Sequence, residues 1–309
     1  MTPETALPPP PWRRAIRYRI SQTLRHSFAW ALFRLPSTWP FTVARWLART
    51  KYRFVRNRYR RYAEEITSCL NVSPEEADRV IERCFELTVS EHLDTSRYRR
   101  MTREDLDQVI EIRGLEHLER ALADGKGAVL YSGHVCGHYT FFLALSLLGF
   151  PVNMLGFVES QDRWMARRWR SFFDRRFRML WMKKGSFGIA VQAINALRRN
   201  GVVTVEIDHT TSKPMIEVEF LSRPANFPSG PALIAQAAGA PLLHFWVNRS
   251  EAWVPQTATI GPPFYVAEDI TTAVTHCAKT LEAEVLADPA SWLTWLFPRK
   301  FLWADGEGS

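Results

Sequence analysis

The chain is organised around a short apolar run, residues 128–131, that a polar turn separates from a second apolar run, residues 139–148. The first run has the length of a buried strand and the second that of a buried helix. Ser132-Gly133 ends the strand, so His134 lies just past its carboxyl end. α/β folds place their chemistry at such corners, because strand ends and helix N-terminal amides converge there. A histidine at this position indicates either a catalytic group or an imidazole with a purely structural role.

Strand-like and helix-like segments alternate along the rest of the chain. Apolar or alternating runs predict strands at residues 109–114, 151–157, 202–208, 216–221 and 241–247. Helical spacing and caps predict helices at residues 115–123, 186–199, 232–238 and 270–287. This alternation predicts an α/β fold with a mixed central β-sheet flanked by helices. We divide the chain into an N-terminal basic helical region, residues 1–105, and one continuous α/β domain, residues 106–309.

Positive charge is concentrated at the start of the chain. The formal net charge is +8, yet residues 1–62 contain fourteen arginine and lysine residues and a single acid, Glu4. Aromatic and apolar residues alternate with these cations, and Pro36 and Pro40 interrupt the segment. The pattern is typical of a pair of basic amphipathic helices at an anionic membrane surface, although two ordinary packed helices with a solvated basic face would also fit it. No helix-turn-helix, zinc or single-strand-binding signature accompanies the charge, so we expect no nucleic-acid partner.

The cysteine pattern and the N-terminus favour an intracellular location. Cys69, Cys84, Cys136 and Cys277 have neither disulfide-framework nor metal-site spacing, which fits a reducing compartment. The first residues lack the basic start and apolar core of a signal peptide. No window of about 20 residues is free of charge and proline, as a spanning helix requires. We expect a cytoplasmic protein, peripheral on the inner face of the cell membrane.

Several separate blocks of sequence resemble one known family. They are Gly125-Lys-Gly127 with Ser132-Gly133-His134, residues 220–225, residues 228–231, residues 235–241 and residues 289–301. Together they resemble the lysophospholipid acyltransferase superfamily, and within it the lipid A biosynthesis acyltransferase branch. The resemblance implies a glycerolphosphate-acyltransferase-like domain that moves an acyl group to a hydroxyl or amine acceptor. The implied donor is a phosphopantetheine-linked thioester on acyl carrier protein or coenzyme A, with no bound cofactor.

The family's motif is a histidine followed five positions later by a carboxylate, and this chain departs from it. His134 is in place, but the fifth position is Tyr139. A phenol with an ordinary pKa of about 10 cannot act as a carboxylate at neutral pH. Another acid could orient the imidazole, with Glu206 and Asp208 as candidates. Alternatively Tyr139 hydrogen-bonds the imidazole in a modified enzyme, or the transfer chemistry is lost and the chain binds a lipid or acyl carrier, or hydrolyses thioesters.

We favour the first explanation. Alternate residues of a strand point the same way, so Glu206 and Asp208 are expected on one face near its end. Two buried acids are costly unless they are paired or functional; the structural alternative is that one meets an arginine and the other faces solvent. The sequence thus predicts an acyltransferase in which His134 is the general base, oriented by Glu206 or Asp208, and the acceptor attacks the thioester directly.

The remaining candidates are assigned to substrate binding. His138 and Tyr139 follow the base, and Arg223 is expected to bind a phosphate or carboxylate, or else to pair with Glu217 or Glu219. His134 and His138 have the spacing of a zinc pair, but no third ligand is recognisable, so no metal is predicted.

Two further pairs complete the predicted substrate site. Arg167 and Arg170 belong to a basic, aromatic-rich segment, residues 163–184, that could hold a phosphopantetheine phosphate, an acidic carrier protein or lipid headgroups. The amides of Ser229 and Gly230, or of the Ser132-Gly133 turn, could face a thioester oxyanion.

Overall fold

The computed structural model describes residues 39–97, 101–157, 177–182, 188–208, 214–250, 255–267, 269–296 and 303–304. Its helices are α2 (Trp39–Leu70), α3 (Pro74–Arg97), α4 (Leu115–Ala123), α5 (His138–Leu147), α7 (Gly188–Leu197), α8 (Gly230–Ala238) and α9 (Ile270–Ala287), with 3₁₀ turns η1 (Leu106–Gln108), η2 (Pro289–Ser291) and η3 (Leu293–Leu296). Its strands are β1 (Ile110–Arg113), β2 (Ala128–Ser132), β3 (Val152–Phe157), β4 (Arg178–Met182), β5 (Val202–Glu206), β6 (Met215–Phe220), β7 (Arg223–Pro228), β8 (Leu242–Asn248) and β9 (Gln256–Ile260).

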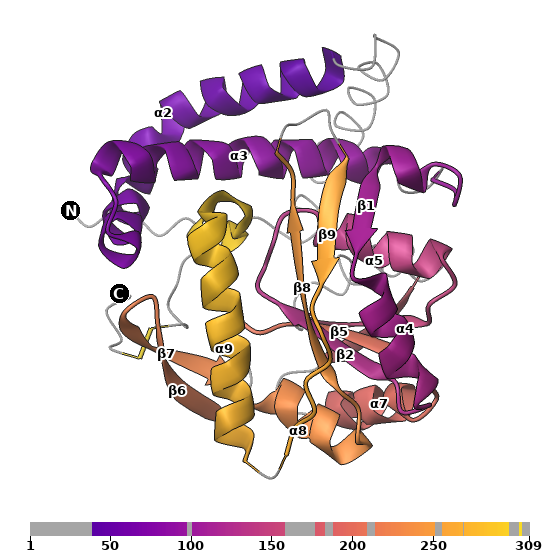
Figure 1. Cartoon of the computed structure of the whole chain (residues 1–309). Helices are drawn as coiled ribbons and strands as arrows, with labels where there is room; N and C mark the ends of the chain where they lie inside the picture. Colours follow the sequence, from indigo (N-terminus) through magenta and orange to yellow (C-terminus); the bar gives the residue numbers. More distant parts are fainter. Residues whose placement is uncertain are drawn as a thin grey trace, which may run out of the picture.

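A seven-stranded mixed sheet, in the order β1-β9-β8-β2-β5-β3-β4, forms the centre of the molecule. Figure 1 labels its strands β1, β9, β8, β2 and β5. Only the β8–β9 pair is antiparallel; the other neighbours within this sheet are parallel. β6 and β7 form a separate antiparallel hairpin. The predicted α/β class, with a mixed sheet flanked by helices and preceded by a helical region, is confirmed.

The two faces of the sheet carry different helices, and this decides where the residues of β2 point. All five residues of β2 are buried, as expected for a central parallel strand covered on both sides. Tyr131 interacts with Cys277 and Thr280 of α9. Its neighbours in the strand, Leu130 and Ser132, therefore point to the opposite face, which α5 covers.

The long helices α2 and α3 lie side by side across one end of the sheet (Figure 1). Ser73 and Glu76 form a capping box that starts α3: the Glu76 amide donates to Ser73 Oγ at 3.2 Å, and the Ser73 amide donates to the Glu76 carboxylate at 2.9 Å. Ile66 of α2 and Ile81 of α3 are fully buried in the same hydrophobic cluster as the sheet. In the part of the chain that the structure describes, no helix combines the length and hydrophobicity needed to cross a bilayer.

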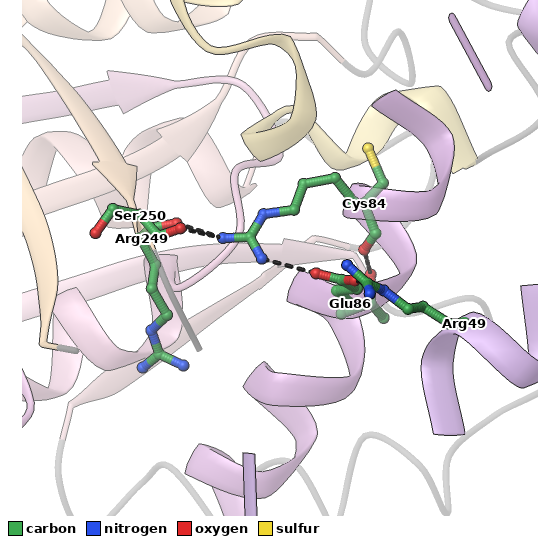
Figure 2. Close-up of polar contacts among 7 residues, drawn as sticks. Arg49, Cys84, Glu86, Arg249 and Ser250 are labelled. Carbon is green, nitrogen blue, oxygen red and sulfur yellow. Dashed lines mark hydrogen bonds and ion pairs between the residues drawn. The ribbon is translucent and has the colours of Figure 1, made fainter. Parts of the chain in front are cut away.

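Polar contacts also connect these two helices to each other and to the sheet. Arg49 of α2 donates to Glu86 of α3 at 2.6 Å (Figure 2). Arg83 of α3 donates to the same carboxylate and to the backbone carbonyls of Arg249 and Ser250, each at 2.8 Å. The helical region is thus bonded to the loop after β8. The division of the chain at residue 105 stays a prediction.

The structure corrects several predicted boundaries. Of the expected pair of basic helices, the part before residue 39 lies outside the described residues, and Pro40 stands in the first turn of α2, where its missing N–H costs nothing. The strand expected at residues 202–208 ends at Glu206, so Asp208 lies beyond it and the two acids do not share a strand face. β4 and β9 were not expected. β7 was not expected either; it pairs with β6 through Leu221 and Ser222, both at positive φ as a two-residue hairpin turn requires.

Candidate active site

A histidine and a carboxylate meet where two neighbouring strands end. β2 and β5 are parallel, with Ser132 opposite Glu206, so both leave the sheet at one edge. The Ile207 amide donates to the Ser132 carbonyl at 2.8 Å, which continues this pairing one residue further. Nδ1 of His134 then lies 2.6 Å from Oδ1 of Asp208, and the backbone amide of His134 donates to Oδ2 at 2.8 Å. The strand register therefore brings together two residues that are far apart in the sequence.

Asp208 is held by the closing segment of the chain as well as by the histidine. Its side chain has no exposed surface, whereas that of His134 is 34% exposed. Oδ2 of Asp208 accepts hydrogen bonds from Nε1 of Trp292 at 2.7 Å and from Oγ1 of Thr294 at 2.5 Å. A buried carboxylate is costly unless such donors and a cation compensate it. These contacts fix the carboxylate in place and favour its charged form.

The pair sets the protonation of both partners. Burial acts to lower the pKa of His134 and to raise that of Asp208, but their mutual attraction and hydrogen bond outweigh it. The pKa of His134 is raised to about 9, and the pKa of Asp208 falls well below its usual range. A carboxylate only accepts hydrogen bonds, so Nδ1 carries the shared hydrogen. Nε2 is then the imidazole nitrogen that gains or loses a proton.

Residues 289–296 also bind the backbone of the turn that carries His134. The Leu293 amide donates to the His134 carbonyl at 2.8 Å, and the Cys136 amide donates to the Ser291 carbonyl at 2.9 Å. The same segment therefore holds the main chain at the histidine and just after it, while its side chains hold Asp208. One segment, residues 289–296, therefore fixes the histidine through its backbone and the carboxylate through its side chains.

Gly133 is the residue that this close approach requires. A Cβ at this position would lie 2.8 Å from Nε1 of Trp292 and 2.9 Å from Oδ2 of Asp208. Both distances are shorter than real Cβ contacts allow. The glycine in the Ser-Gly-His turn thus leaves the room in which Trp292 reaches the carboxylate.

Glu206, the second predicted acid, occupies a different place from Asp208. It is half-buried at the end of β5, and its Oε1 atom is buried with no hydrogen-bond partner among the described residues. Burial raises the pKa of Glu206 above its usual value, while the nearby His134 and a contact with its own backbone amide oppose the rise. Of the two candidate acids, Asp208 is the one hydrogen-bonded to the imidazole, and Glu206 lies beside the pair.

His138 and Tyr139 open α5 next to this pair. Nδ1 of the buried His138 donates to the Val135 carbonyl at 2.5 Å, and burial lowers the pKa of His138 to about 4, so the ring is neutral. The ring of Tyr139 packs against it, with 4.0 Å between centroids. Burial, together with the charges of Glu206 and Glu91, raises the pKa of Tyr139 above that of a free phenol. Tyr139 is therefore a neutral phenol, and the carboxylate at Nδ1 of His134 comes from elsewhere in the chain.

A metal ion has no evident ligand set in this region. Among the residues that the structure describes, no three His, Cys, Asp or Glu side chains are grouped as metal ligands. Nδ1 of His134 and Nδ1 of His138 are both engaged in the hydrogen bonds given above.

The other predicted binding residues have the following positions. The guanidinium of Arg223, at the start of β7, lies over the ring of Trp303 with 4.6 Å to its centroid. Ser229 is buried and donates from its hydroxyl to the Pro214 carbonyl at 3.0 Å, and Gly230 begins α8. These contacts fix both regions structurally, and the substrate-binding roles of Arg223, Ser229 and Gly230 stay predictions. Arg167 and Arg170 lie outside the described residues.

Trp292 and Thr294 are the site residues that the sequence reasoning did not identify. The segment that contains them, residues 289–301, stood out only as one block of the resemblance. That block was the sequence feature that could have pointed to Trp292 and Thr294, because a single tryptophan and a single threonine form no recognisable catalytic motif. Their role becomes visible only when the fold brings them to Asp208.

Comparison with known proteins adds independent information. A family model described as bacterial lipid A biosynthesis acyltransferase matches residues 11–302. Two curated relatives are phosphatidylinositol mannoside acyltransferases of Mycobacterium tuberculosis, from strains CDC 1551 / Oshkosh and ATCC 25618 / H37Rv. Each is 30% identical over 222 residues, which cover 65% of this chain and 62% of the relative. The matched region thus spans less than two thirds of those relatives' length.

Proposed function

The chain belongs to the bacterial lipid A biosynthesis acyltransferase family, and from this membership we propose that it transfers an acyl group from a thioester to a hydroxyl or amine acceptor. The observation that carries the proposal is the 2.6 Å contact between Nδ1 of His134 and Oδ1 of Asp208. A histidine held by a buried carboxylate, with its side chain one-third exposed, has the arrangement of a general base.

The transfer proceeds in one displacement. Nε2 of a neutral His134 accepts the proton of the acceptor hydroxyl as its oxygen attacks the thioester carbonyl carbon. The carbon–sulfur bond then breaks, and the imidazolium returns the proton to the leaving thiolate. Asp208 holds the tautomer in which Nε2 is the base and stabilises the imidazolium that forms. No acyl-enzyme is needed, and atoms and charges balance over the cycle.

Asp208 takes the place of the acid that the motif lacks at Tyr139. The carboxylate reaches His134 from the end of β5, so the tyrosine does not remove the base's partner. This supports an active transferase over a homologue that only binds an acyl carrier or a lipid. A thioester hydrolase uses the same dyad with water as acceptor, and the test below separates it from a transferase.

The donor and the membrane contact extend the proposal. The donor is an acyl thioester on acyl carrier protein or coenzyme A. Trp39, Trp46 and Phe54 of α2 are 57%, 63% and 86% exposed, and their spacing gathers them along one stretch of the helix surface with exposed arginines such as Arg53. Such a surface suits an anionic headgroup region. We place the protein peripherally on the inner face of the cell membrane.

The names of the family and of the relatives indicate a chemical class of acceptor and not a particular molecule. The matching family is named for lipid A and the M. tuberculosis relatives for a phosphatidylinositol mannoside; both names refer to lipids. We propose a membrane lipid that carries hydroxyl groups as the acceptor.

The test is acyl transfer by the purified full-length chain. Mass-tagged palmitoyl-coenzyme A and palmitoyl-acyl carrier protein are each offered with vesicles of a bacterial lipid extract, and product lipids and free acid are measured. We expect tagged lipid with the wild type and a loss of about 10²- to 10⁴-fold with His134→Ala. Undiminished transfer by the variant would refute the assignment, and free acid without tagged lipid would indicate a hydrolase.

A further inference from the structure

A row of polar side chains lies on the sheet beside the catalytic pair and is unused by the mechanism above. Thr204 and Glu206 alternate along β5 and so share one face, and Ser132 of β2 stands opposite Glu206. Ser132 points to the face that α5 covers, which places the whole polar row, residues Thr204, Ser132 and Glu206, on that face. The row ends two residues before His134 on one strand and two before Asp208 on the other.

The buried oxygens of this polar row lack the partners that such atoms normally have. Oγ of Ser132, Oγ1 of Thr204 and Oε1 of Glu206 are buried and make no hydrogen bond to any described residue. Ser132 and Thr204 have no exposed surface at all. A buried polar group without a partner costs free energy, and a carboxylate costs the most. Three such atoms side by side form an unsatisfied polar row in the interior, next to the catalytic pair.

Glu206 is the member of the row that lies nearest the molecular surface. Its residue is half-buried, whereas the two hydroxyl-bearing residues lie deeper. It is close enough to His134 for each to affect the other's pKa. A group bound at Oε1 would therefore sit next to the group that Nε2 of His134 deprotonates. A carboxyl oxygen accepts hydrogen bonds, and a hydroxyl is the simplest neutral donor to meet it.

We propose that Glu206 is a specificity-determining residue that accepts a hydrogen bond from a second hydroxyl adjacent to the acylated one. The substrate class is an acceptor with two neighbouring hydroxyl groups. The inference rests on the proposed transferase function and adds what the acceptor must carry. A lone alcohol leaves Oε1 unsatisfied, because no described residue replaces the missing donor. Discrimination of this kind is strong because a buried polar group is left unpaired with the wrong substrate.

The test compares two acceptors that differ by one hydroxyl, 1,2-dodecanediol and 1-dodecanol in mixed micelles, with tagged palmitoyl-coenzyme A as donor. We expect the wild type to prefer the diol in kcat/KM by about 10- to 100-fold. Glu206→Leu should abolish the preference while the KM for the donor stays unchanged. Glu206→Gln, which retains an oxygen acceptor, should keep part of it. Glu219→Leu, at an exposed glutamate on β6, is the matched control and should keep all of it.

Thermal unfolding separates this role from a structural one. Removing an unpartnered buried carboxylate should leave the unfolding midpoint of Glu206→Leu unchanged or raise it, whereas loss of a structural residue lowers it. A wild type that uses both alcohols equally, or a Glu206→Leu variant that keeps the preference, overturns the subsite.

A failure of the transferase proposal can be told apart from a failure of the Glu206 subsite. If the wild type consumes no thioester, that proposal fails, and the subsite is decided by binding: the diol, but not the alcohol, should raise the unfolding midpoint of the wild type and not that of Glu206→Leu. Equal shifts with the two alcohols contradict it.

Discussion

The hydroxyl of Thr294 donates to Oδ2 of Asp208 over 2.5 Å, although 86 positions separate the two residues. The carboxylate on which His134 depends is thus held from the far end of the chain. Oδ1 faces the imidazole, and Oδ2 accepts from Thr294, Trp292 and the His134 amide. The closing segment is part of the candidate active site, because without its donors Asp208 would be free to turn away from the histidine.

Replacing Thr294 by valine tests this positioning role. Thr294→Val keeps the shape of the side chain but removes one donor to the carboxylate, so we expect kcat to fall about tenfold while the KM for the thioester is unchanged. Thr294→Ser restores the hydroxyl and should recover most of the activity. The check is steady-state transfer by the three proteins. If serine is no better than valine, the hydrogen bond is not what matters at this position.

Gly133 provides a steric test of the same arrangement. In Gly133→Ala the new Cβ would lie 2.9 Å from Oδ2 of Asp208, so the carboxylate and Trp292 must shift. We expect activity to drop at least about 100-fold and the free energy of unfolding to fall by roughly 1–3 kcal/mol. Gly261→Ala is the control, since the nearest atoms to its Cβ are at an ordinary 3.7 Å. Wild-type activity in Gly133→Ala contradicts the packing described for this turn.

The activity should rise with pH. Although burial lowers the pKa of His134, Asp208 and Glu206 outweigh it and raise that pKa to about 9, so much of the resting enzyme carries an imidazolium that cannot accept a proton. The neighbouring His138 is neutral and contributes no charge. We expect kcat/KM to increase through an apparent pKa above that of a free histidine, and Asp208→Asn to lower that pKa. The measurement is a pH profile corrected for uncatalysed thioester hydrolysis. A flat or falling profile speaks against His134 as the base.

The same pair makes stability depend on pH. The folded pKa of His134 lies above its ordinary value, so its contribution is complete below about pH 6.5 and is lost as the pH rises towards about 9. The folded pKa of Asp208 is lowered, so its contribution is present above its ordinary value and is lost as the pH falls through its folded pKa. The unfolding midpoints of wild type and Asp208→Asn should therefore differ most between about pH 4 and 6.5. A difference that grows above pH 7 would have the wrong sign.

The local hydrophobic pattern of the sequence was sufficient to predict part of the fold. The apolar run before His134 and the apolar helix after it are β2 and α5, because a fully buried parallel strand and a buried helix both show as continuous hydrophobic sequence. β4 and β9 were missed because each is five residues long and carries no alternation strong enough to stand out. Their place in the sheet depends on pairing with distant strands, which no local pattern records.

Only some residues of the candidate site could be predicted from the sequence, for the same reason. His134 was identified from its turn, and the departure at Tyr139 pointed to an acid on another strand. The choice between Glu206 and Asp208 depends on where β5 ends, because Asp208 lies beyond the strand and its side chain does not follow the strand's alternation. Trp292 and Thr294 reach Asp208 through tertiary contacts alone. The sequence therefore identified His134 as the proposed base, whereas its partner Asp208 and the groups that hold Asp208 became visible only in the fold.

The most direct test of the His134–Asp208 pair is a double-mutant cycle in single-turnover acyl transfer. His134→Ala, Asp208→Asn and the double variant are compared with the wild type at one pH and saturating donor. If the two residues act as one unit, each single variant should lose roughly 10²- to 10⁴-fold, and the double variant should be little slower than His134→Ala alone. Losses that multiply in the double variant, or an Asp208→Asn enzyme as fast as the wild type, would contradict the catalytic pair.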